Sequence, residues 1–266
     1  MRRILDINNV LAVAGVVIKE LYRRKDFYVL FVMTALITLV LGSIRFFDNA
    51  EIVRFLKQIC LLLVWISMLV IAITTAARQI PVERESRTIL PLLAKPIRRV
   101  EFILGKFAGC WLACLVALAV FYFFFGVITA SHAHAWPGLI FLQAFLFHGV
   151  FLAVVVALVL LGSVVFTAQS SNATITAIIV LGIVFAGGHL DHVAGGMRGL
   201  RSDAVYAVFF AIPHLEWYYN LQDFVIHDWQ AIKWVHVAGA TFYGALYTAL
   251  LLGLTWLVFR RKSLSL

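Results

Sequence analysis

Residues 78–106 read RQIPVERESRTILPLLAKPIRRVEFILGK and form the densest block of charge in the chain. Long apolar runs lie on both sides of this block, so we expect it to lie at a membrane surface. Glu83 and Arg87 are four residues apart, which places them on one side of a helix. Ile89 and Leu93 have the same spacing, so the predicted surface helix also has an apolar side.

Three prolines limit this helix. Pro81 suits a first helical turn, because the N–H that proline lacks has no helical partner there. Pro91 and Pro96 would break a longer helix. The residues alone leave two interpretations open: a surface helix that is moved by something else, or a loop whose positive charge only fixes the membrane topology.

The composition predicts a membrane protein. The chain has 266 residues, of which 63% are hydrophobic and 13% are charged, and its mean hydropathy is +0.99. A soluble domain of this length could not bury so much apolar surface, so the bilayer must solvate most of it. We predict no nucleic-acid partner from the net charge of +9. Cys60, Cys110 and Cys114 lie in or beside apolar runs, and we expect them to be reduced packing residues.

Six apolar runs are long enough to cross a bilayer, which takes about twenty residues of helix. They are residues 27–44, 59–77, 107–129, 139–167, 173–189 and 235–259. The predicted fold class is therefore an all-α membrane protein with a single transmembrane domain over residues 1–266. A shorter helix over residues 8–25 is predicted to lie flat at the interface. Residues 190–234 are predicted to form an external segment with short helices.

Lysine and arginine are distributed unequally between the two sides. If both termini are cytoplasmic, only six of the twenty-two lie outside, namely Arg45, Arg54, Lys57, Arg198, Arg201 and Lys233. Cytoplasmic loops of membrane proteins carry the excess of positive charge. We therefore predict a multi-pass protein of the inner (cytoplasmic) membrane, with residues 78–106 and both termini in the cytoplasm.

The predicted spans contain no aspartate or glutamate. Proton-coupled carriers and intramembrane aspartyl proteases usually need such carboxylates. The chain also has no HExxH motif and no Gly-x-x-x-x-Gly-Lys-Ser/Thr loop for ATP. We therefore predict that this chain is not an enzyme and holds no cofactor, so its energy has to arrive from a partner.

Histidines are the remaining candidates for chemistry. Residues with metal-binding side chains occur in the two external segments, namely His132, His134, His189, Asp191 and His192. No cysteine or methionine cluster accompanies them, and interfacial hydrogen bonding explains them as well, so no metal site is predicted. His148 lies deep in the fourth span, near Gln143. Such groups are often functional, but we expect a neutral His148 that forms a hydrogen bond with a neighbouring helix.

The order of residues in the charged block carries a family resemblance. The residues concerned are Glu83, Arg84, Glu85, Thr88, Leu92, Leu93, Lys95, Pro96, Arg98 or Arg99, Gly105 and Lys106. They resemble the first cytoplasmic loop of the six-span permeases of the type-2 ABC exporter class, where a coupling helix in this loop docks on an ATP-binding subunit. The resemblance implies that docking is done by Glu83, Arg84, Glu85, Arg87 and Thr88. It implies that the helix is positioned by Leu92, Leu93, Lys95, Pro96 and Arg99.

The last third of the chain carries a second resemblance. Its residues are Gly187, Gly188, His189, Leu190, Pro213, His214, Leu215, Glu216, Asn220, Tyr243, Leu246, Tyr247, Phe259, Arg260 and Arg261. They resemble a branch of the same class related to multicopper-enzyme maturation permeases. In that branch short external helices join the fifth and sixth spans. The class also has an elbow helix at the position of residues 8–25.

The resemblance implies the transmembrane subunit of an ABC exporter. Two permease copies, forming a homodimer, would work with two ATP-binding subunits, which hold the ATP and Mg. The dimer face in this class follows the first, second and fifth spans, and small residues on the fifth span are Gly182, Ala186, Gly187 and Gly188. Small residues allow close helix approach in lipid, either between copies or within one chain. The alternative function is a membrane scaffold that passes ATP-driven motion to an envelope protein.

Overall fold

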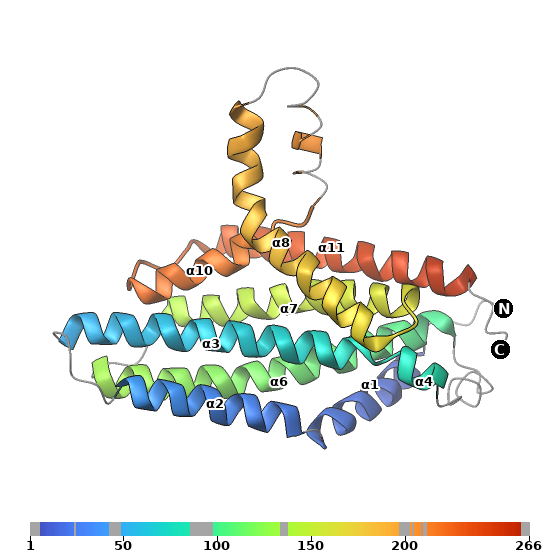
Figure 1. The fold of residues 1–266 in the computed structure, drawn as a ribbon, viewed down its shortest axis with the longest axis horizontal. Helices are drawn as coiled ribbons and strands as arrows, with labels where there is room; N and C mark the ends of the chain where they lie inside the picture. The colour runs from blue at the N-terminus through green and yellow to red at the C-terminus, as the bar shows by residue number, and fades with distance from the viewer. Residues whose placement is uncertain are drawn as a thin grey trace.

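The structure, a computed structural model, describes residues 6–23, 25–42, 49–85, 98–133, 138–196, 203, 205–207, 209 and 212–261. Within these residues the chain is helical and has no strand, as the predicted all-α class requires. The helices are α1 (Ile7–Tyr22), α2 (Lys25–Gly42), α3 (Asn49–Ala77), α4 (Pro81–Glu85), α6 (Arg99–Ala133), α7 (Leu139–Val165), α8 (Gln169–Gly196), α10 (Glu216–Ile226) and α11 (Trp234–Arg261). They form an elongated bundle (Figure 1).

Four helices in the described part of the chain are long and apolar enough to cross a membrane. They cover Val53–Glu83, Arg99–Ser131, Leu139–Val165 and Trp234–Arg261. The other two predicted spans fall on α2 and α8, whose apolar stretches are shorter, Tyr28–Val40 and Gln169–Phe185. Lys25 and Asp26 open α2, and glycine, histidine and aspartate follow the apolar part of α8. Of the six predicted spans, four therefore meet the criteria of length and composition.

The centre of the bundle is α7. It packs against α3, α6, α8, α10 and α11, and the seven consecutive residues 151–157 are all buried. Seven residues make about two helical turns, so the middle of α7 is covered in every direction. A helix that is apolar on all sides is stable in such a position.

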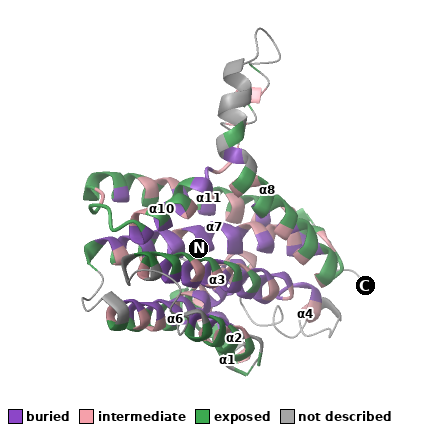
Figure 2. Ribbon diagram, turned by 60° about the vertical axis from the view of Figure 1, so that its left-hand side comes forward, coloured by how far each residue is buried: buried purple, intermediate pink, exposed green. Residues whose placement is uncertain are grey.

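The outer faces of α2 and α11 are apolar and exposed (Figure 2). On α2 they carry Val32 and Leu36, which are 52% and 53% exposed, and on α11 Phe242 is 72% exposed. In water such surfaces would favour aggregation. They are suited to contact with lipid, which confirms that this is a multi-pass membrane protein.

The first helix packs closely on α6. A Cβ atom at Gly105 would lie 2.7 Å from Cβ of Val13, and one at Gly109 would lie 2.7 Å from Cβ of Val17 and 3.0 Å from Cα of Ala14. The two glycines are four residues apart and share one face of α6, where small residues allow two helix backbones to approach. They therefore fix the position of α1 on α6.

The two ends of the bundle differ in their elements. The end formed by α1, α4, the start of α6 and the end of α11 lies on the right in Figure 1, and we call it the loop end. The far end carries α10. There the amide of Gln143 on α7 accepts a hydrogen bond from the backbone N–H of Ile232 (2.9 Å) and donates one to the carbonyl of Ile232 (2.7 Å). Lys57 on α3 also forms an ion pair with Asp228. These contacts hold the segment between α10 and α11 on the bundle.

Candidate functional site

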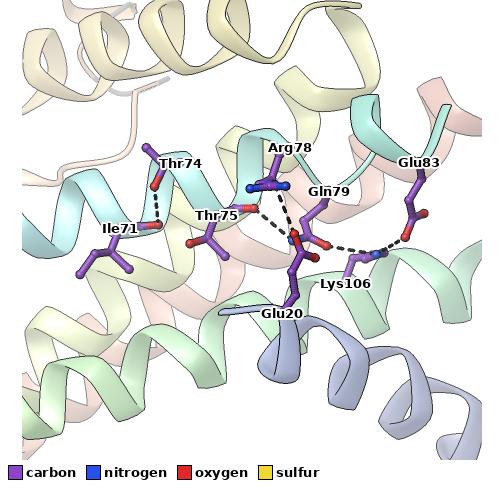
Figure 3. Close-up of polar contacts among 8 residues, drawn as sticks. All are labelled: Glu20, Ile71, Thr74, Thr75, Arg78, Gln79, Glu83 and Lys106. Carbon is purple, nitrogen blue, oxygen red and sulfur yellow. Dashed lines mark hydrogen bonds and ion pairs between the residues drawn. The ribbon is translucent and has the colours of Figure 1, made fainter. Parts of the chain in front are cut away.

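A buried lysine organises the loop end. Lys106 on α6 is 4% exposed, and its ammonium group donates to the side-chain oxygen of Gln79 at 3.0 Å. It also forms an ion pair with Glu83 of α4 (Figure 3). Gln79 in turn donates to the carbonyl oxygen of Thr75 at 3.1 Å. A buried charge is stable only when it is paired and hydrogen-bonded. The Lys106 ammonium therefore connects α6 with the end of α3 and with α4.

A second ion pair connects α1 to the same place. Nε of Arg78, which directly follows α3, lies 3.2 Å from Oε1 of Glu20 on α1 (Figure 3). Both side chains are partly exposed, at 28% and 39%. An exposed pair of this kind contributes about 1 kcal/mol or less to stability. Its main effect is to orient Arg78 toward α1.

Glu101 fixes the start of two helices. It is 2% exposed and accepts the backbone N–H of Arg98 at 3.1 Å, which satisfies a donor at the start of α6. It also accepts the backbone N–H of Asp6 at 3.0 Å and the amide N–H of Asn9 at 3.1 Å. The carboxylate of Glu101 therefore joins the N-terminal ends of α1 and α6.

Arg99 closes the loop end on the side of α11. Its guanidinium donates to the carbonyl oxygens of Phe259 and Arg260, both at 3.0 Å, and it lies 5.6 Å from the Phe259 ring centre. The last carbonyls of a helix have no partner within the helix and carry partial negative charge. Arg99 supplies both the donors and the opposite charge.

The described structure covers part of the predicted docking set. Glu83, Arg84 and Glu85 lie in α4, which begins at Pro81, and Arg99 begins α6. The remaining members lie outside the described residues; they are Arg87, Thr88, Leu92, Leu93, Lys95 and Pro96. Glu83 and Arg99 both have contacts within the chain. The segment predicted to dock is thus anchored at both of its borders.

Several residues of the loop end were not predicted from the sequence. Glu20, Arg78, Gln79 and Glu101 were not predicted as site residues, and Lys106 was named only among the residues that carry the family resemblance. Glu101 sits at the position of a capping-box glutamate, but the residue three before it is Arg98 rather than the serine or threonine of that motif. Thr75 and Gln79 are four residues apart, but this spacing does not indicate that the side chain of Gln79 binds Lys106, which is twenty-seven residues later.

The candidate metal ligands of the external segments and the histidine of the fourth predicted span have different surroundings. His132 lies in α6. Asp191 and His192 lie in α8, together with the exposed His189. His134 lies outside the described residues. Within the described ranges, no three residues among histidine, cysteine, aspartate and glutamate are grouped in a way that could hold a metal ion. His148 is fully buried and stacks on Trp65, with ring centres 3.9 Å apart.

Among the residues that the structure describes, the expected hydrogen bond of His148 to a neighbouring helix is not formed. Neither ring nitrogen has a hydrogen-bond partner among the described residues. Tyr122 and Phe151 lie edge-on to the imidazole, with ring centres 5.9 and 6.2 Å away. Within the described part of the chain, the imidazole is thus held by ring packing and not by hydrogen bonds, whereas Gln143 on the same helix has the two hydrogen bonds described above.

The small residues on α8 have different surroundings. A Cβ atom at Gly187 would lie 2.6 Å from Oε2 of Glu216, so this glycine makes room for a buried carboxylate of the same chain. Glu216 is held by His214, whose Nδ1 lies 3.0 Å from Oε1. A Cβ atom at Gly182 would have no described atom within 4 Å. Of the two explanations for these glycines, packing within the chain applies to Gly187.

The Lys106–Glu83 pair should be needed for stability of the chain alone. Glu83→Gln and Lys106→Met are each expected to lower the free energy of unfolding by about 3 kcal/mol, because one buried charge loses its partner. The double variant should cost less than the sum of the two. Thermal unfolding of the purified chain in detergent measures this, with Lys233→Met as the exposed control. Unchanged midpoints in both single variants would contradict the structural role.

Two substitutions in α7 should have opposite effects. His148→Phe keeps the ring on Trp65 and removes two unpartnered nitrogens, so the unfolding midpoint should stay the same or rise. Gln143→Leu leaves the N–H and carbonyl of Ile232 unpaired, which costs about 1 to 3 kcal/mol. The same thermal assay compares them. A loss of stability in His148→Phe as large as that in Gln143→Leu would show that the imidazole has a partner.

The chain matches a known protein family over most of its length. A family model described as "ABC-2 family transporter protein" matches residues 32–264. This range covers most of the chain, from within α2 to the end of α11. A search of curated proteins found no match to the chain. The long apolar helices and the matched residues together make this chain a membrane permease component of an ABC transporter. The chain belongs to the ABC-2 transporter family.

Proposed function

We propose that this chain is the permease subunit of an ABC exporter, moved by two ATP-binding subunits that dock on residues 78–106. The observation that carries the proposal is the set of contacts between helices at the loop end. At one border of the predicted docking segment, Lys106 binds Glu83 and Gln79 and so connects α6 with α4 and the end of α3. Arg99 connects its other border to α11. A displacement of the segment is therefore passed to three long helices at once.

The proposal includes six crossings with both termini in the cytoplasm. An 18-residue helix such as α2 is about 27 Å long, which is close to the roughly 30 Å of a bilayer core. α8 is longer, with 28 residues. The helices α2, α3, α6 and α7 run in alternating directions along the bundle, and α11 runs in the same direction as α7, with α8 between them in the chain (Figure 1); this supports a repeated crossing. Among the described residues, the loop end carries a cluster of basic side chains, namely Arg78, Arg98, Arg99, Lys106, Arg260 and Arg261, and this supports its cytoplasmic location.

Docking can be tested by charge reversal outside the internal ion pair. Glu85→Lys combined with Arg87→Glu is expected to abolish copurification of an ATP-binding subunit with the tagged chain from native membranes. Glu83 is unsuitable for this purpose, because its substitution also removes the partner of Lys106. Lys233→Glu, at an exposed position near the far end, is the matched control. Copurification equal to that of the unaltered chain, at equal amounts in the membrane, would overturn the docking assignment.

We also propose a homodimer with α8 at the interface between copies. Ile178 and Phe185 on α8 are 65% and 71% exposed, and Gly182 lies between them with open space around it. Large apolar side chains beside a glycine give a surface on which a second helix can pack closely in lipid. Gly187 does not contribute a free surface, because Glu216 of the same chain fills the space beside it.

Disulfide crosslinking distinguishes this interface from a lipid-facing surface. Gly182→Cys should form a crosslinked dimer in oxidised native membranes. Gly239→Cys on α11 is the control, because its surroundings are equally open within the chain. The natural cysteines are buried and should give no background. Crosslinking at position 239 but not at position 182 would place the interface on α11 instead.

A further inference from the structure

A small cavity lies between α1 and the end of α3. Its volume is about 470 Å³, and it is lined by Val16, Lys19, Glu20, Arg23 and Arg78. Two of these lining residues, Glu20 and Arg78, face each other (Figure 3). Lys19 and Arg23 are four residues apart and therefore lie on the same side of α1. The family and its ATP-dependent movement assign no task to this cavity.

The lining carries an excess of positive charge. Three cationic side chains surround one carboxylate, and that carboxylate is 3.2 Å from Nε of Arg78. The Glu20 carboxylate thus offsets one cation, and Lys19 and Arg23 remain exposed beside it. Guanidinium and ammonium groups in such an arrangement bind phosphate oxygens through charge-assisted hydrogen bonds. The cavity is suited to a phosphate oxyanion.

The position of the cavity indicates where this phosphate comes from. Arg78 directly follows α3, so the cavity begins where an apolar helix ends. The lining also has an apolar member on the outer surface of α1, because Val16 is 61% exposed. A phospholipid combines the two matching groups, because its phosphate is attached to hydrocarbon chains. Free phosphate would contact the cations and leave the apolar surface unused.

We propose that this cavity binds the phosphate group of an anionic phospholipid, with an acyl chain beside Val16. Basic groups at the cytoplasmic surface of a membrane attract anionic lipids, and a pocket formed by two helices can select a head group. The site depends only on the membrane location of the chain. Failure of ATP-subunit docking would leave it intact, and loss of the lipid would leave the docking residues unchanged.

Binding is measured on the delipidated full-length protein by native mass spectrometry. The probes are dihexanoyl phosphatidylglycerol, dihexanoyl phosphatidylcholine and inorganic phosphate. The anionic lipid should bind the unaltered chain, and the Lys19→Gln/Arg23→Gln variant should bind it about tenfold more weakly or worse, since two surface cations are lost. The control variant Arg54→Gln/Lys233→Gln loses two exposed cations elsewhere and should bind as the unaltered chain does.

Three outcomes would overturn the proposal. The first is equal affinity of the Lys19→Gln/Arg23→Gln variant and the control variant for the anionic lipid. The second is inorganic phosphate binding as tightly as the lipid, which would identify a free anion as the occupant. The third is loss of a copurifying protein in the Lys19→Gln/Arg23→Gln variant with unchanged lipid binding, which would identify an acidic protein surface instead. Because Lys19 and Arg23 are exposed, their substitution should not impair folding.

Discussion

The whole bundle depends on the burial of α7. A bilayer offers no hydrogen bonds to the backbone, so a membrane protein has to satisfy its backbone polar groups internally. α7 does this while it contacts helices from both halves of the chain. Its backbone also accepts from outside: Gly149 O receives the indole N–H of Trp111 at 2.9 Å, and Val159 O receives the side-chain N–H of Asn172 at 3.1 Å. Each bond joins α7 to a different neighbour and fixes their relative height.

Much of this fold could be predicted from hydropathy. The predicted fourth and sixth spans, residues 139–167 and 235–259, nearly coincide with α7 and α11. The starts of two other helices were predicted too late. α3 begins ten residues before the predicted span at Ile59, and α6 begins eight residues before the one at Phe107. A prediction from hydropathy ends a span at the first charged residue. A helix can continue through charged residues whose side chains are paired.

The charges in question have partners that are distant in sequence. Lys57 in the early part of α3 is bound to Asp228, and Lys106 in the early part of α6 is bound to Glu83. Glu101 is bound to residues around the start of α1. No local pattern contains such pairings, so the sequence indicated a charged block without indicating which charges face inward. For the same reason the docking set could be predicted as a group, but the internal task of Glu83 could not.

The close packing of α1 on α6 has a mechanical consequence. At Gly105 and Gly109 no side chain separates the two helices, and Val13 and Val17 rest directly on the α6 backbone. Glu101 ties their first turns together as well. α1 and the first turns of α6 therefore cannot slide past each other and behave as one rigid lever. A force on this lever would tilt α6 as a whole rather than bend its first turns.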